Sequence, residues 1–328
     1  MNERKTPAIE VLGLAKSFDG VHAVAGVDFT IFQGDLFGFL GPNGAGKTTT
    51  INMLTGLARP DSGTIRIMGI DCSKEPKAAQ HLLGVVPDES NLYPELTGFE
   101  NLCFCAALYG MGKKERTNRA QELLSTFGLA DAAHRKFATY SKGMKRKLTI
   151  AAGIAHRPQI LFLDEPTTGI DVASARQVRQ LVADLHKEET TIFLTTHYIE
   201  EAERLCDQIA FIVSGKIVRI ESVEKLLQPM QNRHVVRISF TSMTHGLLET
   251  LRGSFPDIDF SMPQEGVIRA ESTEAVQVGP VIRLLEDCGA QVYEARRIRP
   301  SLEDVFVRIT GIEADAMQKE KERREKEE

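Results

Sequence analysis

At 328 residues the chain exceeds the size at which a single hydrophobic core usually stops growing, so we expect one larger and one smaller domain. Hydrophobic residues make up 42% of the sequence, but no apolar run approaches the roughly 18 residues that cross a bilayer, and residues 1–7 lack the apolar stretch of a secretory signal. The formal net charge of −5 argues against a nucleic-acid partner, since phosphate binding needs a concentrated basic face.

The first segment with chemical meaning is a glycine-rich loop between a predicted strand, Phe37–Leu40, and a predicted helix, Thr48–Leu57. The loop consists of Gly41, Pro42, Asn43, Gly44, Ala45, Gly46, Lys47 and Thr48. It matches the Gly-x4-Gly-Lys-[Ser/Thr] pattern, whose backbone N–H groups surround phosphate while the lysine reaches the β- and γ-phosphates. The sequence therefore predicts a nucleoside triphosphate site in which the Thr48 hydroxyl binds Mg²⁺.

From Glu89 to about His156 the pattern becomes helical. Leu123, Leu124 and Phe127 are spaced for one apolar helix face. Thr97 and Ser141 are residues of the type that caps helix starts. We predict a helical subdomain over residues 89–156.

Two short apolar segments follow, Ile160–Leu163 and Thr191–Thr195, which predict central parallel strands. Asp164 and Glu165 come directly after the first strand, and His197 comes after the second. Carboxyl ends of strands are the edge where open α/β sheets bind ligands. Two adjacent buried acids are costly unless a cation pairs with them, so we assign Asp164 to Mg²⁺, with a purely structural acid pair as the alternative.

A second unit begins at His234. Its predicted strands are residues 234–240, 257–260, 267–270 and 290–295, and its predicted helices are residues 246–251 and 273–288, the latter broken near Gly279 and Pro280. This βαββαβ order predicts a small ferredoxin-like α+β domain.

The last helix is predicted to start, with a cap, at residues 300–304, and its apolar stripe of Leu302, Val305, Phe306 and Ile309 is assigned to the core. Beyond it, residues 319–328 carry charges without an apolar face and predict a solvated tail. The predicted division is a first domain at 1–220, a linker at 221–233, a small domain at 234–311 and a tail at 312–328.

The phosphate loop, the acid pair and the segment Tyr140–Met144 together resemble the ATP-binding cassette (ABC) ATPases. The resemblance implies a P-loop NTPase cassette of the α/β class, with a RecA-like core, an antiparallel β subdomain and a helical subdomain. By the same resemblance, Glu165 is the catalytic glutamate that orients or deprotonates the attacking water, and His197 is the switch histidine at the γ-phosphate. Thr49 would be a further phosphate contact. Phe18 matches the aromatic that stacks on adenine, and an ordinary core phenylalanine is the alternative.

The segment Tyr140–Met144 is similar to the ABC signature, in which Ser141 and Gly143 open a helix that closes over the γ-phosphate bound by a second subunit. The resemblance thus implies a composite ATP site shared with a second copy of the chain or a paralogous ATPase, and Asp171 matches the loop between the two sites. Lys142 and Met144 depart from the family's glycine and glutamine. Asp88 stands where the family most often has glutamine, and its carboxylate could still ligate Mg²⁺.

Residues 91–98, 140–146 and 301–306 look like those of type-2 ABC exporter ATPases of the drug-resistance and efflux kind. This resemblance implies a peripheral protein on the cytoplasmic face of the cell membrane. There it would dock on a separate transmembrane permease through the helical subdomain and residues 88–100, and have no nucleic-acid partner. Three alternatives stay open: an importer ATPase, an ABC ATPase acting in translation or on nucleic acid, and a regulatory ATP-binding module without turnover.

Overall fold

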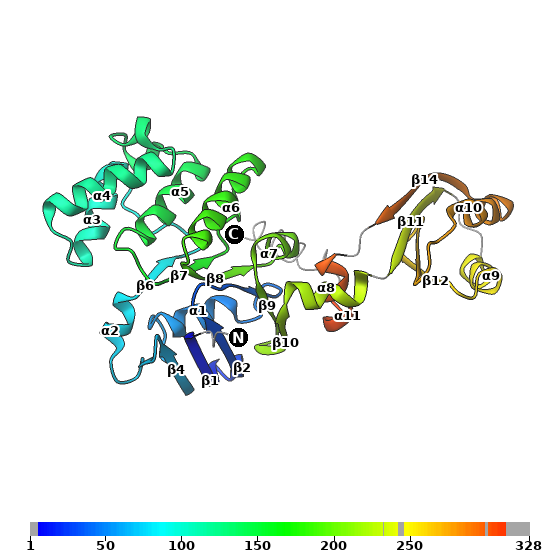
Figure 1. Cartoon of the computed structure of the whole chain (residues 1–328), viewed down its shortest axis with the longest axis horizontal. Coiled ribbons are helices and arrows are strands. Elements are labelled where there is room, and N and C mark those ends of the chain that lie inside the picture. Colours follow the sequence, from blue (N-terminus) through cyan, green and yellow to red (C-terminus); the bar gives the residue numbers. More distant parts are fainter. Residues whose placement is uncertain (1–5, 232, 242–245, 299–300, 313–328) are drawn as a thin grey trace, which may run out of the picture. The chain divides into compact units, whose positions relative to one another are not determined.

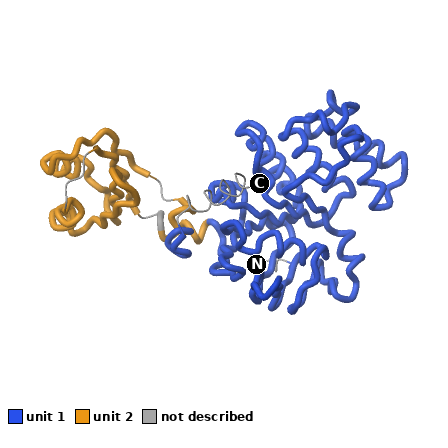
Figure 2. The backbone as a smooth tube through the Cα atoms, turned by 180° about the vertical axis from the view of Figure 1, so that it is seen from behind, with its two compact units in different colours: residues 1–223, 306–328 blue, residues 224–305 orange. Residues whose placement is uncertain are grey.

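The computed structural model describes residues 6–231, 233–241, 246–298 and 301–312. The chain divides into two compact units, Met1–Val223 with Phe306–Glu328 and Glu224–Val305 (Figures 1 and 2). The predicted tail lies outside the described residues except for Ile312.

The first unit is built around a six-stranded sheet of order β10-β9-β3-β8-β7-β6. The strands are β3 (Leu36–Leu40), β6 (Leu83–Val86), β7 (Ile160–Asp164), β8 (Thr191–Thr196), β9 (Gln208–Val213) and β10 (Lys216–Ser222). All neighbours are parallel except β9 and β10. Strands β3, β7 and β8 are buried along their whole length, which is why they read as continuous apolar runs. The predicted α/β class and its central strands are confirmed.

A second, antiparallel sheet of order β2-β1-β4-β5 shares a hydrophobic core with the first. It contains β1 (Pro7–Phe18), β2 (Val21–Phe32), β4 (Ser62–Ile67) and β5 (Ile70–Asp71). Phe29 of β2 lies 5.8 Å, ring centroid to centroid, from Phe37 of β3, and further aromatic contacts reach Phe39 and Phe193. The aromatic cluster holds the two sheets in one body.

Helices gather on the side of the six-stranded sheet away from β1, β2 and β4 (Figure 1). They are α3 (Gly98–Leu108), α4 (Lys113–Thr126) and α5 (Lys142–Gly153). The predicted Thr97 cap is present as a capping box with Glu100, and Leu123, Leu124 and Phe127 are buried as predicted. The other helices of this unit's sheet region are α1 (Lys47–Leu54), α2 (Pro76–His81), α6 (Val172–Lys187) and α7 (Ile199–Leu205).

The segment predicted as a linker, residues 221–233, is largely helical. Strand β10 runs to Ser222, and α8 spans Val223–Gln231 with Pro229 inside it. Leu226 is buried, so an apolar contact favours helix here in spite of the proline.

The second unit contains β11 (His234–Thr241), α9 (Leu247–Ser254), β12 (Asp259–Gln264), β13 (Val267–Ser272), α10 (Val278–Asp287) and β14 (Gln291–Ile298). Its elements follow the predicted βαββαβ order, in an antiparallel sheet of order β12-β13-β11-β14. The helix predicted from Thr273 with a break near Pro280 instead begins at Val278. Pro280 lies in its first turn, where a missing backbone N–H costs nothing.

Helix α11 (Leu302–Thr310) is shared between the two units. Leu302 and Val305 are buried and belong to the second unit, whereas Phe306 belongs to the first and packs edge-to-face on Phe211 of β9, with centroids 5.2 Å apart. The second unit at 224–305 therefore differs at both ends from the predicted domain at 234–311.

Candidate active site

The glycine-rich loop connects β3 to α1 and touches its surroundings so closely that side chains are excluded. A Cβ atom on Gly41 would lie 2.1 Å from the carbonyl oxygen of Ile212, and one on Gly46 would lie 2.2 Å from that of Ala23. Gly46 also has a φ of +103° at the start of α1. Both positions require glycine, and the loop is thereby fixed with the helix N-terminus behind it.

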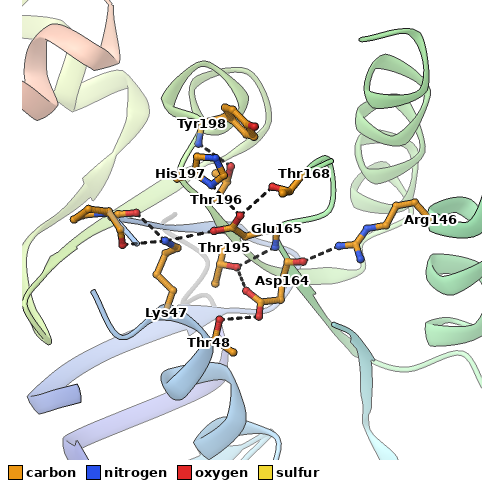
Figure 3. Close-up of polar contacts among 12 residues, drawn as sticks. Lys47, Thr48, Arg146, Asp164, Glu165, Thr168, Thr195, Thr196, His197 and Tyr198 are labelled. Carbon is orange, nitrogen blue, oxygen red and sulfur yellow. Dashed lines mark hydrogen bonds and ion pairs between the residues drawn. The ribbon is translucent and has the colours of Figure 1, made fainter. Parts of the chain in front are cut away.

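Lys47 is the cation of this loop, and only 6% of its surface is exposed. Its Nζ donates to the carbonyl oxygens of Gly41 at 2.8 Å and Pro42 at 3.2 Å, and lies 3.5 Å from Glu165 Oε1 (Figure 3).

Thr48 and Asp164 form an oxygen pair at the end of β7. The Thr48 hydroxyl donates to Asp164 Oδ2 at 3.0 Å, and the Thr195 hydroxyl donates to Oδ1 of the same carboxylate. Oxygen ligands of this kind suit Mg²⁺. Among the described residues no group of three or more His, Cys, Asp or Glu side chains could hold a metal ion.

Glu165 follows Asp164 with a backbone φ of +45°, a left-handed conformation that is unfavourable for a residue with a side chain. Its Oε2 accepts a hydrogen bond from Thr168 at 2.9 Å and lies 2.8 Å from His197 Nδ1 (Figure 3). Burial alone would raise the pKa of Glu165, but the contact with His197 and the charge of Lys47 lower that pKa to about 2. The carboxylate is therefore ionised at neutral pH and can accept a hydrogen bond from water.

These groups surround a cavity of about 790 Å³, a volume that suits a nucleotide. The predicted site residues that line it are Asn43, Gly44, Gly46, Lys47, Thr48, Thr49, Asp88 and Glu165. The remaining loop residues, Gly41, Pro42 and Ala45, do not line it, and Asp164 and His197 are buried without lining it. Residues from four separate stretches of sequence thus meet at one sheet edge.

The family model for the ABC transporter matches residues 24–168. The chain is 38% identical over 318 residues to the daunorubicin/doxorubicin resistance ATP-binding protein DrrA of Streptomyces peucetius, covering 96% of each chain. The chain belongs to the ABC transporter ATP-binding proteins. It is also 34% identical over 306 residues to the linearmycin resistance ATP-binding protein LnrL of Bacillus subtilis, covering 92% of this chain and 98% of that protein.

An ABC cassette solved as a dimer in a post-hydrolysis state with ADP and Pi, MJ0796, matches the structure with a TM-score of 0.61 and 26% identity, over 66% of this chain and 98% of that one. The predicted ABC ATPase is confirmed: this chain binds and hydrolyses ATP as the energy-supplying subunit of a transporter. No helix in the described part of the chain is long and apolar enough to span a membrane.

The predicted signature residues of this ABC cassette lie at the start of α5. Ser141 is the N-cap and accepts a hydrogen bond from the Met144 N–H at 3.2 Å. A Cβ atom on Gly143 would lie 2.2 Å from the Ser174 hydroxyl of α6, and Ser174 in turn donates to Asp171 at 2.6 Å. Neither Ser141 nor Gly143 lines the cavity of its own chain, although Lys142 does.

Phe18, the predicted adenine-stacking residue, is at the end of β1 and is 52% exposed, so it is not part of a packed core. The Lys16 ammonium lies 5.4 Å from its ring centroid. Phe18 does not line the 790 Å³ cavity, and its contact with a nucleotide stays a prediction.

Two buried charged residues near the site had no role in the sequence prediction. Arg146 of α5 donates to the backbone carbonyl oxygen of Asp164 at 2.6 Å (Figure 3) and to that of Pro166 at 2.8 Å. Glu201 of α7 is fully enclosed, and burial raises the pKa of its carboxyl group. Arg146 could not be found from a local motif, because the carbonyl groups that it binds are 18 to 59 positions away in the sequence.

Acid should remove the stability that ionised Glu165 contributes. Its pKa of about 2 in the folded chain lies below the ordinary 4.5, so this contribution is complete above pH 4.5 and is lost as the pH falls toward 2. We expect the free energy of unfolding of the wild type to fall, relative to Glu165→Gln, by on the order of 2–3 kcal/mol across that window.

Urea unfolding of the first unit at a series of pH values measures this difference. Glu200→Gln is the control for the loss of one carboxylate, because the Glu200 side chain is exposed and its ion pair is with Arg204, outside the site. Parallel pH profiles for the wild type and Glu165→Gln would show that Glu165 is not held as an ionised group.

Proposed function

We propose that two ATPase chains, two copies of this one or this chain with a paralogous ATPase, close over two ATP molecules and thereby drive a separate transmembrane permease that exports small or lipophilic compounds. The observation that carries the proposal is the division of the site. Lys47, Thr48 and Glu165 line one cavity, whereas Ser141, the N-cap of α5, does not line it, although the next residue, Lys142, does. A second chain's Ser141 would complete each site, and the dimeric state of MJ0796 supports this arrangement.

Hydrolysis follows from the positions of this chain's groups. Lys47 binds the β- and γ-phosphates, and ionised Glu165, held by Thr168 and His197, accepts a hydrogen bond from the attacking water and aligns it. Mg²⁺ bound with the triphosphate would be held by Thr48, Asp164 and Asp88 and would neutralise charge on the phosphate oxygens. Closure of the second chain would exclude bulk water.

A second cavity of about 700 Å³ supports permease docking. It lies among α2, α3 and the residues after β6, and it is lined by Thr55, Leu57, Gln80, His81, Val85, Leu108 and Tyr109, among others. Leu57 and Leu108 are 72% and 68% exposed, an apolar rim that suits a helix from a membrane subunit. Docking there would place the chain at the cytoplasmic face of the membrane.

Glu89 and Ser90 line both this cavity and the nucleotide cavity. A movement of these residues on ATP binding would therefore reach the docked helix directly. The names of the relatives, which refer to resistance against daunorubicin, doxorubicin and linearmycin, support export of such compounds.

Replacing Glu165 by glutamine should trap an ATP-bound dimer, because ATP still binds but water is no longer activated. Size-exclusion chromatography with light scattering should give a dimer with ATP and a monomer without it. Adding Lys47→Ala to the same chain should abolish the dimer. A Glu165→Gln chain that binds ATP and stays monomeric would contradict the composite site.

Mixing two inactive variants tests the division of the site between chains. Ser141→Arg should bind ATP but not hydrolyse it, and Lys47→Ala should fail to bind it. In an equimolar mixture, half of the dimers contain one chain of each variant. In each mixed dimer one of the two sites has both an intact phosphate loop and an intact Ser141, so activity should recover to about a quarter of wild type. If affinity tags show that mixed dimers form but ATP hydrolysis does not recover, the two chains do not share the ATP site.

Leu57→Glu combined with Leu108→Glu should release the chain from the membrane fraction of its own cells, since two charges would then face the docked helix. ATP hydrolysis by the isolated chain should be unchanged. Val218→Glu is the matched control, because Val218 is also exposed but lies on β10, outside the cavity. Release by the control alone, or retention of the double variant, would contradict the docking site.

A further inference from the structure

The guanidinium group of Arg146 binds backbone carbonyl groups from two different loops at once. Its Nε donates to Pro166, just after β7, at 2.8 Å, and one terminal nitrogen donates to Asp164, the last residue of β7, at 2.6 Å. The other terminal nitrogen donates to Asp88 at 3.0 Å and also to Pro87, both after β6. The planar fork of arginine makes this possible, and the single ammonium of lysine could not reach the same set.

Arg146 is only 6% exposed, so its charge depends on the protein for compensation. Burial lowers its pKa, and four carboxylates act against that effect: those of Asp88, Asp164, Glu201 and Glu165. The Arg146 guanidinium therefore interacts electrostatically with all four of these carboxylates. Figure 3 shows it reaching the strand end from the α5 side, opposite to Lys47.

The two carbonyl groups that Arg146 binds at the end of β7 belong to the residues on either side of Glu165. Asp164 precedes it and Pro166 follows it, and Glu165 itself has the unfavourable φ of +45°. Such a backbone conformation persists only where several surrounding contacts hold it in place. The Glu165 N–H donates to Thr195 O at 3.1 Å, and the Glu165 carbonyl accepts a hydrogen bond from the Thr168 N–H at 3.2 Å. Arg146 adds a restraint on the carbonyl groups of the residues before and after Glu165.

We propose that Arg146 is a positioning residue for ATP hydrolysis: by binding the carbonyl groups of Asp164 and Pro166, it holds Glu165 in the conformation that aims its carboxylate at the nucleotide. Through Pro87 and Asp88, the same guanidinium fixes the loop after β6 to that strand end. Since Arg146 belongs to α5, the helix that begins at Ser141 moves together with both loops. The coupled movement of α5 and the two loops rests on the proposed two-chain function. The effect of Arg146 on Glu165 depends only on ATP hydrolysis by this chain.

Arg146→Ala should lower kcat about 100-fold, the cost of a misplacement near 1 Å, while the ATP affinity changes by less than about 3-fold. Arg146 lines the nucleotide cavity, but its hydrogen bonds end on carbonyl groups at the ends of β6 and β7 and not on the phosphate loop, so the affinity should persist. Millimolar guanidinium ion should restore part of the kcat by occupying the vacated space, and it should not restore Glu165→Gln. ATP binding is measured with a fluorescent ATP analogue and turnover by phosphate release.

Arg119→Ala is the matched control. Arg119 also donates to backbone carbonyl groups, those of Ile154 at 3.2 Å and Ala155 at 3.3 Å, but it lies outside the nucleotide cavity. Its replacement should lower the melting temperature and leave kcat within about 2-fold, as expected for a structural contact.

Arg146→Lys keeps the charge and serves if the alanine variant does not fold. It should fold, reach only part of the carbonyl set, and show the same loss of kcat at nearly unchanged ATP affinity. A wild-type kcat in either variant would overturn the proposal. Equal losses of kcat and affinity without rescue by guanidinium would also overturn it, because Arg146 would then be a purely structural residue.

Discussion

The site depends on the compensation of charges that are withdrawn from water at the carboxyl ends of β7 and β8. The Lys47 ammonium lies 3.5 Å from the Glu165 carboxylate, which also lies 2.8 Å from His197 Nδ1, while Asp164 is held by two threonine hydroxyl groups. Without a triphosphate each group already has a partner. ATP then exchanges one set of contacts for another, so little reorganisation is needed when phosphate arrives.

The site also requires the backbone of the phosphate loop to pack directly against neighbouring strands. Gly41 and Gly46 bring the phosphate loop against β9 and β2 at distances that exclude a Cβ atom, and Glu165 is kept in a left-handed conformation. Both features cost conformational free energy, and both occur where the chain would contact a bound ligand or the reacting water. Rigid contacts around them, including those of Arg146, explain why the chain can hold these conformations.

Much of this could be predicted because the signals are local. The phosphate loop, the acids after Leu163 and the cap at Thr97 each lie within a few residues of the element that they define. Arg146 could not be predicted in this way, since its bonds join residues 18 to 59 positions apart and end on carbonyl oxygens, which every sequence offers. Pro229 and Pro280 misled the prediction, because proline is tolerated in a helix whose other contacts favour it.

Helix α11 gives the second unit an unusual covalent setting. The chain leaves the first unit at Val223 and re-enters it at Phe306, whose ring packs on β9. The second unit is thus an insertion rather than an appendage, and it is tethered at both ends. Truncating the chain before residue 306 would strip an aromatic ring from the ATPase core, so an active minimal cassette would have to be made by internal excision that retains α11's second half.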